Sequence, residues 1–356
     1  MIKEQMMMEK RSKNMELGMT TFLHTNPEHG GVSPAERLRQ AIEEIQLADQ
    51  VGLDVYAIGE HHRIDYTSSS PAIILATAAS TTKRIRLSSA VTVLSSDDPV
   101  RVYQDFATLD VLTKGRAEIM AGRGSFVESF PLFGYNLNDY EELYEEKLEL
   151  LLKIRANEKV TWGGGHRPAI HDMGVYPRAQ QDPLPVWIAT GGNPESAVRA
   201  GKLGLPVIFS IIGGMPERFA PLVELYKEAA KKAGHDPGKL QIATHSHGFI
   251  AESFESAAEQ YFPVMAEQMN KIGRERGWAP YTHDTFKEAC NLRGALYVGD
   301  PEYVAEKILL AQEKLSLTRF LMYVDFSSLS HLELLRTIEL FGTKVAPIVR
   351  KELARK

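Results

Sequence analysis

The sequence has almost no cysteine, no surplus of positive charge and no long apolar run. Its single cysteine, Cys290, excludes an internal disulfide and a cysteine-rich zinc site. Lys plus Arg (41) and Asp plus Glu (46) nearly balance, which gives nucleic acid no electrostatic basis as a partner. The best candidate for a membrane segment, residues 203–216, is interrupted by glycines and is shorter than the roughly 18 residues that a bilayer requires. We therefore expect a cytoplasmic protein that acts on small molecules and has no membrane or nucleic-acid partner.

The sequence indicates a folded chain with a short disordered N-terminal segment. Residues 1–14 mix charged side chains with methionines and lack the central apolar run of about 7–15 residues that marks a signal peptide. We predict a disordered N-terminal extension there. The chain is 44% hydrophobic and 24% charged, which are ordinary values for a globular protein. We expect residues 15–356 to form a single domain.

Short runs rich in β-branched and aromatic residues alternate with helical periodicity along the whole chain. Strand–helix alternation requires parallel strands with helical crossovers, and eight such units close a barrel. The sequence therefore predicts an α/β fold, a (β/α)8 TIM barrel with insertions at 158–183 and 273–301. The alternative is an open doubly wound sheet, but its typical G-x-G-x-x-G turn is absent after the first run. The eight expected strands are 15–22, 53–59, 85–94, 117–122, 184–190, 206–212, 241–251 and 319–326.

Several helix starts are marked by a capping side chain followed by proline. These pairs are Ser33-Pro34, Asp98-Pro99, Asn193-Pro194 and Asp300-Pro301. The first predicts a helix over 34–51. Ser330 and Glu333 form a capping-box pattern that opens the last helix.

Active sites of such barrels lie at the carboxyl ends of the strands, so the residues that follow each strand are the candidates. Glu60, His61 and His62 follow the second strand. Neighbouring side chains of an extended segment point apart, so these three cannot all serve one atom. We interpret one histidine as catalytic. The alternative is a buried Glu60 bonded to backbone, with the histidines at the surface.

Two further strand ends carry features that suit an anion. Arg123 follows the fourth strand between two glycines, and Ser125 comes after the second glycine. The permanently charged guanidinium group of Arg123 could therefore bind a phosphate or carboxylate. The alternative is a structural ion pair with a neighbouring acidic residue such as Glu128. After the fifth strand, Gly191 and Gly192 precede a capped helix start at Asn193, where amides and the helix dipole attract anions. There the alternative is simply a well-capped helix.

His245 and His247 lie two residues apart on the seventh strand and therefore on one face. With Asp325 near the end of the eighth strand they could bind a metal ion, which would suit a metal-dependent hydrolase. A satisfied polar pair in the mouth of the barrel is the more common arrangement.

Several motifs in order resemble the bacterial luciferase-like flavin-dependent monooxygenase family. They are IRLSSAVTVL at 85–94, DPVR at 98–101, LTKGR at 112–116, GRG at 122–124 and FG at 133–134, with EHH at 60–62 upstream. The resemblance implies a (β/α)8 barrel with an insertion near 158–183. It implies that His61 is catalytic and that Arg123 binds the phosphate of flavin mononucleotide (FMN). The other residues it implies for cofactor binding are Glu60, Ala90, Val91, Ser125, Gly192, Asn193 and Ser196, with a non-proline cis peptide at Ala90–Val91.

The same resemblance implies the reaction. A separate flavin reductase would supply reduced FMN, which reacts with O2 to a flavin hydroperoxide and oxygenates a small organic substrate. Gly122 stands where luciferase has a reactive cysteine, which argues against light emission. The alternatives are a deazaflavin-dependent hydride-transfer enzyme of the same fold, the metal-dependent hydrolase above, and a flavin-binding protein without turnover. Relatives pair through helices that correspond to 71–82 and 100–113, so a homodimer is expected.

Overall fold

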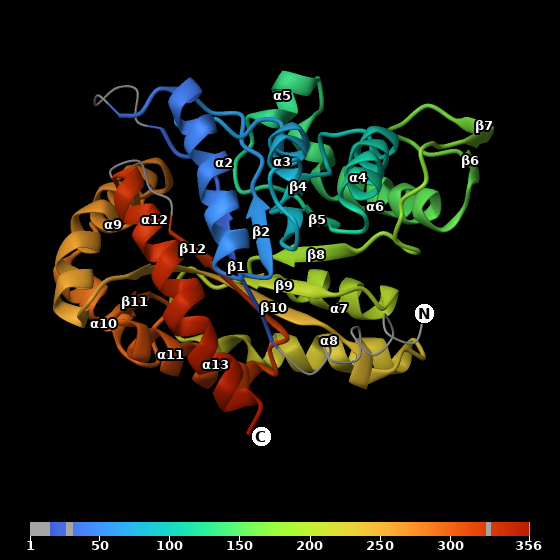
Figure 1. Cartoon of the computed structure of the whole chain (residues 1–356). Helices are drawn as coiled ribbons and strands as arrows, with labels where there is room; N and C mark the ends of the chain where they lie inside the picture. Colours follow the sequence, from blue (N-terminus) through green and yellow to red (C-terminus); the bar gives the residue numbers. More distant parts are fainter. Residues whose placement is uncertain (1–14, 26–30, 325–328, 356) are drawn as a thin grey trace.

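The computed structural model describes residues 15–25, 31–324 and 329–355. Eight parallel strands form a closed barrel in which β12 pairs with both β10 and β1, and β9 pairs with β10. Helices surround this barrel (Figure 1). The predicted (β/α)8 fold is therefore confirmed, and each expected strand run contains a barrel strand. The barrel strands are β1 (Glu16–Thr21), β2 (Val55–Ile58), β3 (Arg86–Ser89), β5 (Ala117–Gly122), β8 (Val186–Thr190), β9 (Val207–Ser210), β10 (Ile242–Ile250) and β12 (Arg319–Tyr323).

The expected helix starts carry the expected caps. The side chains of Ser33, Asp98, Asn193 and Asp300 each accept a hydrogen bond from a first-turn amide. Ser330 and Glu333 form the complete capping box. The main helices are α2 (Pro34–Gln50), α3 (Pro71–Ala79), α4 (Pro99–Thr113), α6 (Tyr140–Ala156), α7 (Pro194–Leu203), α8 (Ala220–Lys232), α9 (Phe254–Arg276), α11 (Pro301–Leu315), α12 (His331–Leu340) and α13 (Ala346–Leu353).

The two expected insertions contain secondary structure of their own. In the first, β6 (Lys159–Trp162) and β7 (Ile170–Gly174) form an antiparallel hairpin that projects from the barrel (Figure 1). In the second, α10 (His283–Cys290) follows α9, and β11 (Tyr297–Gly299) pairs with β10 outside the barrel. β11 was not predicted, because three residues are too few for a periodicity to show.

Side chains from alternate strands fill the interior of the barrel. At its base, Arg319 lies over the Trp187 ring at 4.1 Å and forms two hydrogen bonds to Glu118, of 2.7 and 3.0 Å. From Trp187 onward the interior is apolar, and the carboxyl ends of the strands then open into a cavity. The apolar interior residues are Val55, Ala57, Met120, Trp187, Ile208, Ala243 and Leu321.

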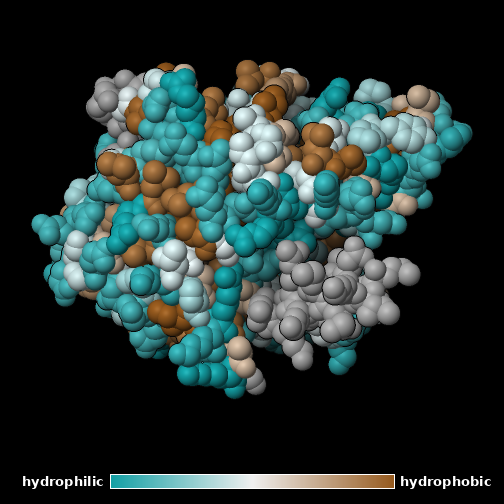
Figure 2. All heavy atoms as spheres, in the orientation of Figure 1, coloured by the Kyte–Doolittle hydropathy of each residue, from teal (hydrophilic) through white to brown (hydrophobic). Residues whose placement is uncertain are grey.

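The visible surface is mainly polar with scattered apolar side chains (Figure 2). Apolar side chains gather over the short helix α5 (Ser129–Phe133), where Leu132 and Phe133 are exposed. Within the described ranges, every helix is too short or too polar to cross a membrane.

Candidate active site

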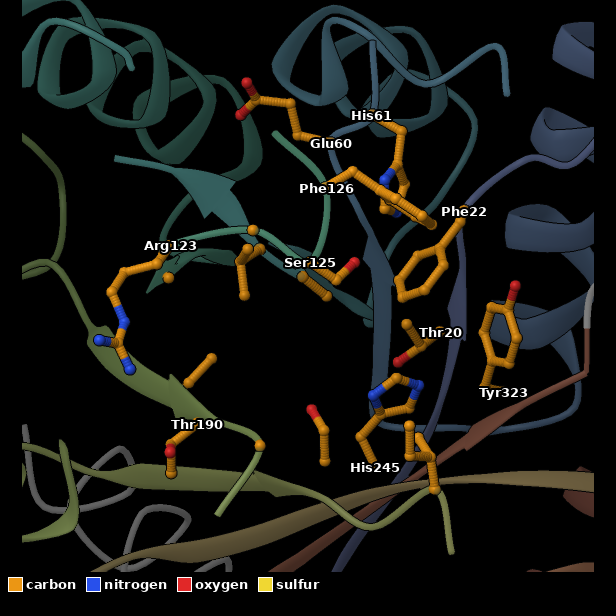
Figure 3. A pocket seen from close by; sticks show the side chains of 18 of the residues that line it. Thr20, Phe22, Glu60, His61, Arg123, Ser125, Phe126, Thr190, His245 and Tyr323 are labelled. Atoms are coloured by element: carbon orange, nitrogen blue, oxygen red, sulfur yellow. The ribbon is translucent and has the colours of Figure 1, made fainter. Parts of the chain in front are cut away.

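A cavity of about 530 Å³ lies at the carboxyl ends of the barrel strands (Figure 3). Its position is the one that the barrel architecture predicts, because the loops after the strands converge there. It has a size typical of small-molecule sites. Of the predicted site residues, Glu60, His61, Ala90, Val91, Arg123, Ser125 and Asn193 line it directly. Gly192 and Ser196 do not line the cavity, but both belong to the loop and first turn that carry Asn193.

The side chain of Arg123, just after the end of β5, contacts the start of α7. Its guanidinium donates a hydrogen bond to Ser196 Oγ at 3.2 Å and forms an ion pair with the half-exposed Glu141. It also lies 5.4 Å from the centre of the Tyr140 ring. The two anion-binding features that were predicted separately, Arg123 and the start of α7, are therefore neighbours in space. The alternative of an ion pair with a neighbouring acidic residue is correct in kind, because Arg123 pairs with Glu141, but Glu128 is not the partner, since it pairs with Arg63 at 2.9 Å.

The amides at the start of α7 are already hydrogen-bonded within the chain. Gly192 N and Asn193 N donate to Thr190 Oγ1, at 3.2 and 3.1 Å. Glu195 N and Ser196 N donate to Asn193 Oδ1, at 2.7 and 3.2 Å. These four amides therefore already have partners within the chain, and the alternative of a well-capped helix is confirmed. What the helix start offers instead is its dipole and the polar side chains of Asn193 and Ser196, beside Arg123.

His61 lies in an aromatic part of the cavity wall. Its ring stacks on Tyr66 at 4.3 Å and meets the edge of Phe22 at 4.6 Å. Burial lowers the pKa of His61 to about 3, and the nearby His24 acts in the same direction. Asp65 opposes this shift, but its carboxylate is shared with Arg63 and Lys271. His61 is therefore a neutral imidazole at pH 7.

Glu60 forms a pair with His62 at the edge of the cavity. Glu60 Oε2 accepts a hydrogen bond from Val93 N at 2.9 Å, and Oε1 lies 2.9 Å from His62 Nε2. Figure 3 shows the Glu60 carboxylate turned away from the centre of the cavity, whereas the His61 ring borders it. The side chains of Glu60 and its neighbour His61 thus point in different directions, as the extended backbone geometry predicts. The alternative interpretation is correct for the backbone bond of Glu60 and wrong for His61, which is buried.

The Ala90–Val91 peptide bond is cis, as the resemblance implies. It lies between β3 and the two-residue strand β4 (Thr92–Val93), and the Val91 side chain packs against Gly122. A Cβ atom at Gly122 would lie 2.7 Å from a methyl carbon of Val91, so this approach requires glycine at position 122.

His245 and His247 both reach the cavity from one face of β10, as predicted. Burial lowers their pKa values to about 4 and about 3, so both rings are neutral at pH 7. Asp325, the third expected metal ligand, lies outside the described residues. Among those that are described, no group of three or more ligating side chains could hold a metal ion.

Sequence reasoning missed the aromatic wall and the contribution of α9 to the cavity. Phe22, Tyr66 and Phe126 line the cavity, but aromatic residues near strand ends look like ordinary core in a sequence. The second half of α9 also lines the cavity, with Gln268 and Arg276. Only the rule that strand ends form the site could have identified Phe22, and no sequence pattern pointed to α9.

Comparison with known proteins identifies the family. A sequence model of the luciferase-like monooxygenases matches residues 15–317. An uncharacterized protein of Sinorhizobium fredii is 27% identical and covers 91% of this chain and 95% of that protein. The alkanal monooxygenase alpha chain of Photorhabdus laumondii is 28% identical over 57% of this chain and 56% of that protein.

Solved structures share the fold at low identity. Monooxygenase RslO1 from Streptomyces bottropensis superposes with a TM-score of 0.83 at 23% identity, covering 94% of this chain and 99% of that one. The oxygenating constituent of 3,6-diketocamphane monooxygenase from Pseudomonas putida, in complex with FMN, gives 0.75 at 20% identity, covering 94% and 98%. An F420-dependent secondary alcohol dehydrogenase gives 0.73 at 20% identity, covering 95% and 99%. From the family match over most of its length, the chain belongs to the luciferase-like monooxygenase family.

Proposed function

We propose that this protein is a flavin-dependent monooxygenase that uses reduced FMN and O2 to oxygenate a small organic substrate. The single observation that carries the proposal is the 3.2 Å contact between the Arg123 guanidinium and Ser196 Oγ at one end of the cavity. It joins a permanent positive charge to the positive end of a helix dipole, which suits a phosphate. The family supplies the flavin chemistry, and the solved relative in complex with FMN supports this cofactor.

The residues present fit such a cofactor. Arg123, Ser196 and the Asn193 side chain would hold the phosphate, and the cavity walls beyond them are largely apolar, as a flavin ring requires. Glu141 would have to leave Arg123. An ion pair with a half-exposed carboxylate contributes only about 0–1 kcal/mol, which is less than a charge-assisted bond to phosphate provides.

The chain's own contribution is to bind, orient and exclude water. Reduced FMN, when bound, supplies the electrons that activate O2. The rings of Phe22, Tyr66 and Phe126 keep water from the reacting centre. His61, neutral and bordering the cavity, can donate a proton from one ring nitrogen and accept one at the other.

Oxygen consumption tests the proposal. The purified protein is mixed with reduced FMN, or with reduced F420, in an oxygen electrode. We expect the protein to bind reduced FMN and to change the rate at which it consumes O2, and to leave the slow reaction of reduced F420 with O2 unchanged. Tight binding of F420 without binding of FMN would instead support the deazaflavin-dependent alternative, which the F420-dependent structural relative favours.

The proposed function needs a reductase and a substrate as partners, and we propose a homodimer as its assembly. The helix α3 is apolar on several sides, and Ile73 on it and Leu112 on α4 are exposed. A helix that is apolar all round is usually covered, so this face suits a second copy of the chain.

A further inference from the structure

Two buried polar atoms at the cavity have no partner within the described chain. They are Nε2 of His245 and Oγ1 of Thr20, on side chains only 9% and 1% exposed. Both side chains line the cavity. Buried polar atoms nearly always have a hydrogen-bond partner, so an unpartnered pair at a cavity points to an atom of a bound molecule.

These two side chains lie away from the proposed phosphate end. Strand alternation puts His245 on the same face as Ala243, which belongs to the apolar interior of the barrel. The His245 ring is 5.9 Å from Phe22 and 5.5 Å from Tyr323. Figure 3 shows His245 and Thr20 on the opposite side of the cavity from Arg123. A molecule held here would therefore not occupy the phosphate site.

This end of the cavity presents hydrogen-bonding groups without charge. Burial lowers the pKa of His245 to about 4, so its ring is neutral at pH 7, and the same holds for His247. Within the described part of the cavity wall the cationic side chains are Arg123, on the far side, and Arg276. Arg276 is exposed and donates to the Ser125 carbonyl at 2.9 Å. An anionic group gains nothing at His245.

The walls around this end are flat and aromatic. Phe22 and Tyr323 flank His245, and Tyr66 and Phe126 line the same cavity. Such walls suit a ring system, because aromatic side chains supply broad apolar contact area. A neutral imidazole and a hydroxyl each offer both a donor and an acceptor, so a hydroxyl or a carbonyl oxygen satisfies them.

We infer that His245 and Thr20 form a substrate subsite that holds the hydroxyl or carbonyl oxygen of a neutral, largely apolar cyclic compound. The inference rests on the proposed function, since it names the substrate class of that same cavity. A site built to hydrogen-bond an oxygen rejects an analogue that lacks it far more strongly than an apolar pocket discriminates size.

Three fluorescent probes of one skeleton test the inference: 2-naphthol, naphthalene and 2-naphthoate. Their binding to the purified full-length protein is measured at pH 7.5. We expect 2-naphthol to bind at least about tenfold more tightly than either other probe. His245→Leu should reduce the affinity for 2-naphthol to that for naphthalene without changing naphthalene binding, and His245→Gln should retain part of the preference. The exposed His171 on the hairpin provides the control, because His171→Leu should change nothing.

Equal binding of the three probes, no binding of any, or tightest binding of 2-naphthoate would overturn the inference. A loss of FMN affinity in His245→Leu that matches its loss of 2-naphthol affinity would also overturn it, since His245 would then contact the cofactor. Failure of the proposed function has a different signature. The wild-type protein would then not bind FMN, whatever its preference among the naphthalene probes.

Discussion

Burial controls the protonation of the imidazoles around the cavity. The largest cause of the lowered pKa is desolvation in His61, His245 and His247 alike. A neutral imidazole keeps one donor and one acceptor, which suits proton transfer and substrate orientation better than a fixed positive charge in an apolar cavity. The same three residues should make the folded state sensitive to acid.

The pH dependence of stability tests this description of His61. Its pKa is about 3 in the folded chain and about 6.5 when exposed. The unfolded chain therefore takes up the proton first as the pH falls, and stability that is present above pH 6.5 is lost toward pH 3. Between pH 7 and pH 5, His61→Asn should lose about 2 kcal/mol less unfolding free energy than wild type.

Urea unfolding at the two pH values measures this difference. Comparing the variant with wild type cancels the other titrating groups, and His171→Asn serves as a control at an exposed site. Identical pH dependence in His61→Asn and wild type would show that His61 is not buried in its neutral form.

At the scale of elements, the start of α7 has two roles that can be separated. Asn193 caps the helix and lines the cavity, whereas Asp300 caps α11 and does not line it. Each cap accepts hydrogen bonds from first-turn amides, so its removal should lower the unfolding free energy by about 1 kcal/mol. Of these two capping residues, only Asn193 lies beside Arg123.

Asn193→Ala should therefore weaken both the fold and FMN binding, the latter several-fold. Asp300→Ala should lower stability by a similar amount and leave FMN affinity unchanged. Denaturant titration and FMN fluorescence quenching report the two quantities. Equal FMN affinities in the two variants would contradict the proposal that Asn193 contacts the cofactor.

The elements that sequence predicts well are those with local signals. The barrel strands show as apolar runs, and the helix starts show as capping side chains with proline. The run at 85–94 does not reveal that β3 and β4 are separated by the bond between Ala90 and Val91. The position of α9 depends on contacts such as that of Glu275 with Arg63, 212 residues apart in the chain, which no local pattern contains.

At the scale of the whole molecule, a charged cluster at the base of the barrel joins distant strands. Glu118 of β5 pairs with Arg319 of β12 and with Arg86 of β3. Arg319 also pairs with Glu16 of β1. The Glu118–Arg319 pair is almost wholly buried, so the removal of one partner leaves a poorly compensated charge. This cluster lies at the opposite end of the barrel from the cavity.

Glu118→Ala should therefore lower the unfolding free energy by about 3 kcal/mol, at the low end of the usual range because Glu16 still pairs with Arg319. FMN affinity should not change. Glu339→Ala removes a half-exposed partner of Arg336 and should cost less than about 1 kcal/mol. Equally mild losses in the two variants, measured by urea unfolding, would mean that the basal cluster does not hold the barrel together.

Some features of the site could be predicted from sequence motifs, and others could not. His61, Arg123 and Asn193 follow predicted strands, and closure of the barrel brings them to one cavity. The cap by Asn193 was predicted, but the hydrogen bonds that Gly192 N and Asn193 N donate to Thr190 Oγ1 could not be, because they depend on the orientation of the Thr190 side chain. The lowered histidine pKa values could not be predicted either, since they depend on packing from several strands.

The central claim is that Arg123 and the start of α7 together bind the phosphate of a flavin, and the paired binding of FMN and riboflavin tests it most directly. The two ligands differ only in the phosphate, so riboflavin is the internal control. In Arg123→Ala, the Kd for FMN should rise about 10- to 100-fold, the equivalent of one charge-assisted hydrogen-bonded contact, while the Kd for riboflavin stays the same. Equal changes for the two ligands, or no change for either, would contradict the claim.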